Sequence, residues 1–316
     1  GSHSVIDVRR STVAGTDVFS LGGARNSTIT VADSTLTGVV VASVLADAVA
    51  GVSLTVTNST LTATRYAASI VGTWISDVAI VVSGCRFALN GGDNVGVVAL
   101  SSSALANAAV FISASSIACK ARSYVGLVGA SRDRITWTNV TISASVLNIT
   151  ISAEYYAATL GTASSRDATW TNVSINVTST DVSANGANLA IFGCIAENVA
   201  WTNVTVSVAL ALLLSTTRDV VALAAAASRQ DVVWTNVVVT VIMVNVTATA
   251  GNNAGIIGST GARNLYWSNV SVTAALTNIT STANRLVAIL GGGSSSAASL
   301  SDVSIIAAMT SVTSSV

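Results

Sequence analysis

A nine-residue segment recurs through the second half of the chain. Its copies read ITWTNVTIS, ATWTNVSIN, VAWTNVTVS, VVWTNVVVT and LYWSNVSVT, the first starting at Ile135. The apolar residue three positions after the Asn marks each copy, and these markers, Ile142, Ile175, Val206, Val239 and Val272, are 33, 31, 33 and 33 residues apart. A nearly constant period of this length indicates a stacked repeat architecture, because a single repeat of this kind cannot bury its own apolar face.

The marker continues beyond these five copies. It reaches Ile305 in one direction and, with shorter spacings, Val110, Ile80, Leu54 and Ile29 in the other. Two further segments recur with it: an apolar triplet, as at 127–129 and 256–258, and an alternating segment, as at 146–151 and 276–281. We therefore expect an all-β fold, a single parallel β-helix (β-solenoid) of about ten coils of 25–33 residues with three short strands in each coil. It would occupy 1–316 as one domain, with irregular shorter coils over 1–104 and regular Trp-Thr-Asn-Val coils over 105–316.

Composition agrees with stacked strands and excludes several partners. The chain has no proline, which would remove a hydrogen bond wherever it entered a central strand. Hydrophobic residues make up 51% of the chain and charged residues 9%, yet no apolar run approaches the ~20 residues of a membrane helix, so we expect no membrane span. With zero net charge and a single lysine, Lys120, we expect no nucleic-acid partner. Three cysteines leave at least one thiol outside any intrachain disulfide.

Alternation within each copy predicts which side chains face inward. Val140 and Ile142 alternate with polar residues, as do their counterparts in other copies, and we expect them to form aliphatic stacks in the core. Corners are expected where Asn or Asp recurs three or four residues before the Trp, because these residues tolerate left-handed conformations and bond to their own backbone. The corner positions are Asp133, Asp167, Asn198, Asp231 and Asn264.

The Trp-Thr-Asn-Val coils and their Asx corners resemble the parallel β-helix (pectin-lyase-like) superfamily, and are similar to large repetitive β-solenoid surface proteins of protists. In the polysaccharide-cleaving members, the resemblance implies carboxylates clustered on neighbouring coils. Here the acidic residues are dispersed, mostly at corners, and the only histidine is His3. We therefore expect no catalytic residue, no metal site and no cofactor.

Eight Asx residues stand at one place in successive copies, and two interpretations apply to them. They are Asp77, Asn107, Asn139, Asn172, Asn203, Asn236, Asn269 and Asp302. One interpretation is an Asx ladder, in which stacked side chains bond to each other or cap a bend. The other is N-glycosylation, since four members are followed two residues later by Ser or Thr.

The chain contains ten such sequons in all. They lie at Asn26, Asn58, Asn139, Asn148, Asn172, Asn176, Asn203, Asn245, Asn269 and Asn278. Asn148, Asn245 and Asn278 each follow a ladder Asn by nine residues, which predicts a second column on another face and makes them the preferred acceptors. Adjacent coils lie ~4.8 Å apart, so glycans on every coil of one column would be crowded.

A tryptophan precedes each of five ladder asparagines by two residues. Trp137, Trp170, Trp201, Trp234 and Trp267 are expected to stack in register as a structural aromatic ladder. If exposed, the rings would instead form a carbohydrate-binding strip, and they would also be placed to pack against the first sugar of a glycan on the ladder.

These features favour a non-enzymatic structural glycoprotein at the cell surface or outside the cell, forming a rod, fibre segment or coat. We expect the chain to assemble with itself head to tail and its other contacts to involve glycans. An adhesive or carbohydrate-binding solenoid that uses the Trp column is the alternative. An ice-binding solenoid ranks lower, because the Thr-x-Thr pattern of Thr28/Thr30, Thr55/Thr57 and Thr136/Thr138 fails at Ala200 and Val233.

Overall fold

The fold is one parallel β-solenoid. The computed structural model describes residues 3–22, 25–45, 48–71, 74–91, 94–101, 104–121, 124–129, 131–154, 156–228, 230–284 and 286–315. The ordered elements of these residues are all strands, and they belong to one 17-stranded sheet. No helix in the described part of the chain is long and apolar enough to cross a membrane.

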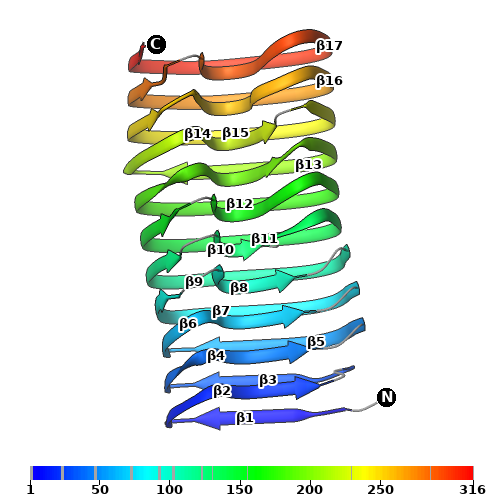
Figure 1. The fold of residues 1–316 in the computed structure, drawn as a ribbon, viewed down its shortest axis with the longest axis vertical. Helices are drawn as coiled ribbons and strands as arrows, with labels where there is room; N and C mark the ends of the chain where they lie inside the picture. Colours follow the sequence, from blue (N-terminus) through cyan, green and yellow to red (C-terminus); the bar gives the residue numbers. More distant parts are fainter. Residues whose placement is uncertain are drawn as a thin grey trace.

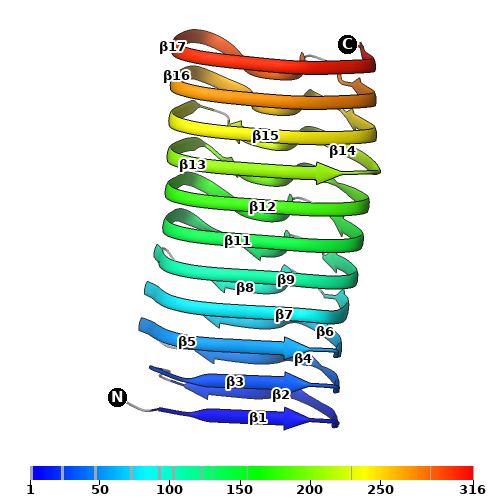
Figure 2. The same ribbon diagram turned by 180° about the vertical axis from the view of Figure 1, so that it is seen from behind.

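The strands follow one another along the axis of the solenoid, from the N-terminus at one end to the C-terminus at the other (Figure 1). Their bounds are β1 (Val5–Arg9), β2 (Thr12–Gly22), β3 (Thr28–Ala32), β4 (Thr35–Leu45), β5 (Ala48–Thr57), β6 (Thr60–Val71), β7 (Trp74–Asn90), β8 (Asn94–Ser101), β9 (Ala104–Ala121), β10 (Tyr124–Gly129), β11 (Ser131–Ala153), β12 (Tyr156–Ala196), β13 (Asn198–Leu210), β14 (Leu213–Ser228), β15 (Asp231–Ala250), β16 (Asn253–Thr282) and β17 (Leu286–Ser315). Seen from behind, the same stack shows β1, β3, β5, β7 and β9 below β11 on one face (Figure 2).

The marker residues are register partners of one another. Each pairs in parallel with the next, in the order Ile29, Leu54, Ile80, Val110, Ile142, Ile175, Val206, Val239, Val272 and Ile305. Ile6, which the sequence pattern did not mark, extends this series by pairing with Ile29. The Trp-Thr-Asn-Val copies therefore lie directly above one another, as their period predicts. The irregular coils and the regular coils form one continuous ladder, because β7 pairs with β9 and β9 pairs with β11.

The prediction that each coil contains three short strands is wrong. Near the N-terminus a coil holds two strands, since β1 pairs with β3 and β2 with β4. Further along, β11 contains both the Trp-Thr-Asn-Val segment and the alternating segment at 146–151 without a break. The physical reason is that a single left-handed residue, such as Asn139 with φ 54°, bends the strand while the backbone ladder resumes at the next residue.

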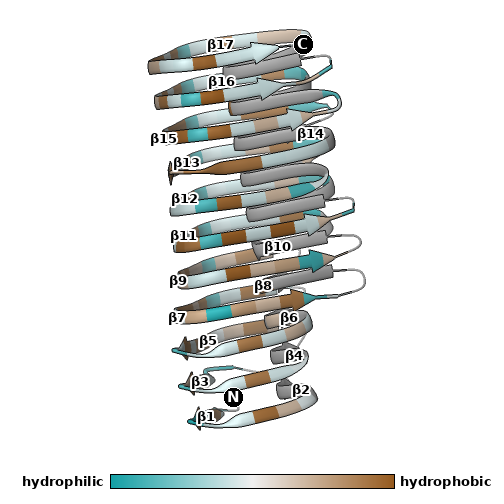
Figure 3. Ribbon diagram, turned by 90° about the vertical axis from the view of Figure 1, so that its left-hand side faces the viewer, coloured by the Kyte–Doolittle hydropathy of each residue, from teal (hydrophilic) through white to brown (hydrophobic). Residues whose placement is uncertain are grey.

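Alternation along the strands builds the core. Val140, Ile142, Val204 and Val206 are each 0% exposed, so the predicted inward orientation is confirmed. Figure 3 shows hydrophobic and hydrophilic residues alternating along the strands and recurring from coil to coil. Burial of one such Val or Ile side chain is worth about 1.5–3 kcal/mol, so this column contributes to the cohesion between coils.

The coils lengthen along the chain. Ser11 and Ser34 occupy equivalent corners 23 residues apart, whereas Asn236 and Asn269 are 33 apart. The inward position filled by Trp137 is filled in the preceding coils by Leu105, Ile75 and Val49. Longer coils thus coincide with a larger buried side chain at this position.

Candidate functional site

The most regular polar feature is the Asx column of the Trp-Thr-Asn-Val segment. All eight members, from Asp77 to Asp302, have φ between 50° and 54°. Such left-handed backbone is uncommon outside glycine, and Asn and Asp are the residues that best tolerate it. Each member therefore marks a bend at the same place in its coil.

A continuous chain of side-chain hydrogen bonds links this column. The Nδ2 group of each Asn donates to the Oδ1 atom of the Asx residue in the preceding coil. The donors Asn107, Asn139, Asn172, Asn203, Asn236 and Asn269 lie 2.8–3.0 Å from their acceptors. All the bonds run in one direction, so the chain of hydrogen bonds begins on Asp77, which as a carboxylate can only accept.

The two ends of the column differ in chemistry. Toward the N-terminus it continues through Gly51 and Asn26, which also have positive φ, and the Asn26 carboxamide lies so close to Gly51 that a Cβ there would clash with it. Toward the C-terminus it ends at Asp302, whose carboxylate accepts from the Ser301 hydroxyl at 3.0 Å. A carboxylate has no hydrogen to donate to Asn269, so the chain of bonds stops there.

The early coils contain a second set of corners, which the sequence pattern does not predict. Arg10, Asp33, Asn58 and Gly84 all have positive φ, and Asn58 donates to the Oδ1 atom of Asp33 at 3.3 Å. Their recurrence is obscured because four different residue types fill the position. Only the Asx-Ser pairs at 33–34 and 58–59 carry a signal that could have revealed it.

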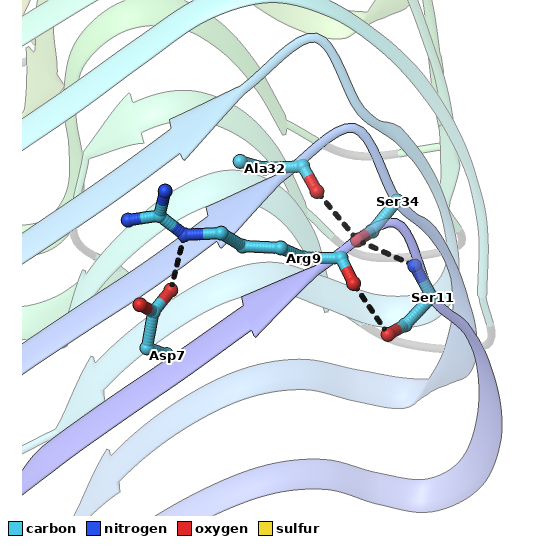
Figure 4. A network of polar contacts seen from close by, with 5 residues as sticks. All are labelled: Asp7, Arg9, Ser11, Ala32 and Ser34. Atoms are coloured by element: carbon cyan, nitrogen blue, oxygen red, sulfur yellow. Dashed lines mark hydrogen bonds and ion pairs between the residues drawn. The ribbon is translucent and has the colours of Figure 1, made fainter.

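Serine hydroxyls complete these corners (Figure 4). The Ser34 hydroxyl donates to the carbonyl of Ala32 at 2.7 Å and accepts the backbone N–H of Ser11 at 3.2 Å. The Ser11 hydroxyl donates to the carbonyl of Arg9 at 2.8 Å, and the Arg9 guanidinium donates to Asp7 at 3.0 Å. The hydrogen bond with Asp7 raises the pKa of Arg9. The Ser34 hydroxyl thus satisfies one backbone group of its own coil and one of the preceding coil, and the Ser11 hydroxyl satisfies one backbone group of its own coil.

The Asx residues before the tryptophans, expected to be left-handed corners, do not have positive φ at 167, 198, 231 and 264, and their side chains bond to one another in pairs. Asn198 donates to Asp167 at 2.9 Å, and Asn264 donates to Asp231 at 2.7 Å. Arg134, in the coil before Asp167, forms an exposed ion pair with it at 3.1 Å. The side chain of Asp133 lies outside the described residues.

The five tryptophans form a buried stack. Their exposed fractions do not exceed 2%, their ring centroids are 4.7–5.1 Å apart, and successive planes differ by at most 6°. Offset-stacked aromatic pairs contribute about 0.5–1.5 kcal/mol each beyond their area burial. Their indole N–H groups are buried without an acceptor among the described residues, so the column coheres by stacking and apolar packing.

Burial of the tryptophan rings contradicts two hypotheses, a carbohydrate-binding strip and packing against an attached sugar. A carbohydrate-binding strip needs exposed aromatic faces, and the structure places all five inside the core. For the same reason, a sugar attached to a ladder Asn has no tryptophan face to pack against. Both ideas are therefore wrong for these residues.

The sequons occupy two kinds of position. The sequon residues Asn26, Asn58, Asn139, Asn172, Asn203, Asn245, Asn269 and Asn278 are all left-handed corner residues. Asn148 and Asn176 are exposed residues of β11 and β12 without positive φ. Asn278 donates to Asn245 at 3.0 Å, so these two lie in adjacent coils, as the expected second column requires.

Other groups that could carry chemistry include the histidine, the cysteines and the possible metal ligands. No group of three or more His, Cys, Asp or Glu side chains in the described residues is placed to hold a metal ion. His3 is exposed and contacts the carbonyl oxygen of Asn26. Cys85 and Cys119 are buried free thiols, and burial raises the pKa of both. The side chain of Cys194 lies outside the described residues.

No protein-family model, curated protein or solved structure matches this chain. The architecture, a single parallel β-solenoid, is compatible with a β-helix superfamily.

Proposed function

We propose that this chain is a non-enzymatic structural glycoprotein that forms a rigid rod, fibre segment or coat element at the cell surface or outside the cell. The single observation that supports this best is the repetition of one set of contacts from coil to coil. The same Trp stack, the same Asn ladder and the same aliphatic column run along the axis. Such a molecule has nearest-neighbour cohesion throughout and no hinge is needed between its coils.

The proposal includes a count of about ten coils of 25–33 residues. At ~4.8 Å per coil, ten coils span about 48 Å along the axis. Small-angle scattering or negative-stain microscopy of the isolated chain measures this length. A rod much shorter than this would mean that successive markers do not occupy successive coils.

Head-to-tail self-assembly remains a prediction. The coils differ in length along the chain, and this difference limits how completely two copies could pair end to end. A first coil of about 23 residues cannot pair along the whole edge of a coil of 33. Ile305, which is 45% exposed, is part of the apolar surface that a second copy would cover. Sedimentation velocity at micromolar concentration distinguishes growth into long rods from a concentration-independent single species.

Ice binding keeps its lower rank. Outward Thr-x-Thr pairs do occur on another face, at Thr35/Thr37, Thr60/Thr62, Thr247/Thr249 and Thr280/Thr282. Arg86, which pairs with Thr60, and Leu214, which pairs with Thr247, interrupt that face between them. A measurement of thermal hysteresis tests it directly.

The experiment that tests the main proposal is immunogold electron microscopy of cells that produce the protein, together with a screen for turnover of polysaccharides. We expect label on the cell surface or in the surrounding matrix and no turnover. Label confined to the cell interior would contradict the location. Turnover that is abolished by changing one interior Asp or Glu would contradict the structural role.

A further inference from the structure

Backbone conformation separates the ten sequon asparagines into two groups. Eight have φ between 48° and 55°, which places each at a bend of its coil. The other two, Asn148 and Asn176, lie in strands without positive φ, and their side chains are exposed. On an extended strand, side chains stand roughly perpendicular to the sheet, so these two carboxamides project away from the solenoid.

Contacts divide the sequons in the same way. Six of the eight corner asparagines, Asn58, Asn139, Asn172, Asn203, Asn269 and Asn278, donate their Nδ2 group to a neighbouring coil. Asn245 accepts from Asn278, and Asn26 packs against Gly51. The side chains of Asn148 and Asn176 have no hydrogen-bond partner among the described residues.

Neighbours in the stack decide how much room a glycan has. Asn139, Asn172 and Asn203 follow each other in consecutive coils, ~4.8 Å apart, so three branched glycans there would overlap. Asn176, by contrast, lies between Ser143 and Ser207. A glycan on Asn176 meets only small side chains in the coils above and below.

The surroundings of Asn148 are similar. It lies between Ser116 and Asp181, neither of which is an N-glycan acceptor. The next sequon of that column is Asn245, three coils further along. Glycans on Asn148 and Asn176 therefore have no glycosylated neighbour in the adjacent coil of their own columns.

We propose that Asn148 and Asn176 are the N-glycan acceptors of the folded protein and that the eight corner asparagines are not modified in it. This inference rests on the proposed function, because N-glycans are added on the route to the cell surface. A glycan added to a corner Asn before folding replaces one of its two amide hydrogens and places a bulky group where the next coil must stack. Chains so modified do not complete the ladder, and the folded population is depleted of them.

The test uses the chain secreted from a eukaryotic host, with intact-mass measurement and glycopeptide mapping. Thr178→Ala removes the sequon of Asn176, and Thr150→Ala removes that of Asn148, without changing either Asn. The matched control is Ser174→Ala, which removes the sequon of Asn172 in the same strand, β12. We expect the first two variants each to lose the mass of one glycan and Ser174→Ala to lose none.

Two results would overturn the inference. One is a loss of glycan mass in Ser174→Ala, or glycopeptides from the folded protein that carry glycans on corner asparagines. The other is secreted, folded protein without a glycan on Asn148 or Asn176. Neither result affects the structural role, which fails instead if the native protein is found inside the cell or turns over a polysaccharide.

Discussion

Replacement of Asn203 separates the two contributions of a ladder residue to stability, its side-chain hydrogen bonds and its tolerance of left-handed backbone. Asn203 lies in the middle of the column, has φ 54°, donates to Asn172 at 3.0 Å and accepts from Asn236 at 3.0 Å. Asn203→Gly removes both side-chain hydrogen bonds but keeps a residue that adopts positive φ without cost. Asn203→Ala removes the same bonds and forces alanine into the left-handed region.

The magnitudes follow from these contacts. Loss of two hydrogen bonds at about 0.5–1.5 kcal/mol each, on an exposed face, lowers the free energy of unfolding of both variants by about 1–2 kcal/mol. The left-handed conformation costs alanine about 1–2 kcal/mol more, while glycine loses about 0.5–1 kcal/mol through its more flexible unfolded state. The Ala variant should therefore be less stable than the Gly variant by about 1 kcal/mol.

Thr205 provides a control at which the order of stability of the Gly and Ala variants should be reversed. It is an exposed residue of β13 without positive φ, two positions after Asn203. There, Thr205→Gly should be less stable than Thr205→Ala by about 0.5–1 kcal/mol, because glycine is unfavourable within a strand.

The assay is urea unfolding of unglycosylated protein, followed by circular dichroism and by the fluorescence of the buried tryptophans. Coils of a solenoid can unfold in steps, so the two signals are compared before a free energy is assigned. If Asn203→Ala proves as stable as Asn203→Gly, or more stable, position 203 does not require left-handed backbone. The account of the ladder as a series of bends would then be wrong.

Three further predictions concern other parts of the solenoid. Trp201→Ala should lower the free energy of unfolding by about 3–5 kcal/mol because of the cavity that it leaves. Trp201→Leu should lower it clearly less, since Leu105 fills the equivalent position in an earlier coil, and equal melting temperatures for the two variants would contradict this. Asp302→Asn should stabilise the coil of β17 by about 0.5–1.5 kcal/mol, because the new carboxamide can donate a hydrogen bond to Asn269. This stabilisation would be measured as slower hydrogen exchange in β17, and unchanged exchange would show that the chain of hydrogen bonds cannot be extended to residue 302. Burial raises the pKa of Cys119, so the thiol stays protonated in the folded protein at a pH where it ionises in the unfolded chain. The stability that this difference contributes is present below about pH 9 and is progressively lost above it. Cys119 in the native protein should therefore resist alkylation by iodoacetamide until urea is added, and rapid alkylation without urea would show that the thiol is accessible.

Periodicity made the architecture predictable. The spacing of the markers depends only on residue positions, and in the structure the same residues are register partners from Ile29 to Ile305. The inward orientation of Val140 and Ile142 was equally accessible, because alternation over a few residues of one strand determines it.

The orientation of Trp137 could not be read in this way. Strict alternation from Val140 would point Trp137 outward, since the two are three residues apart. The left-handed conformation of Asn139 between them shifts the alternation, so that both side chains face the core. Whether a residue at such a position adopts this conformation depends on the coil stacked above and below it.

The sequence alone thus determined the repeat, the parallel β-solenoid and the residues that form its aliphatic column. The tertiary structure decided which strands continue around a corner, where the tryptophan rings lie, and which sequon asparagines have partners. The reason is distance along the chain. Alternation is set by neighbours two residues apart, whereas the partner of each ladder residue is 30 to 33 residues away and is defined only once the coils have stacked in register.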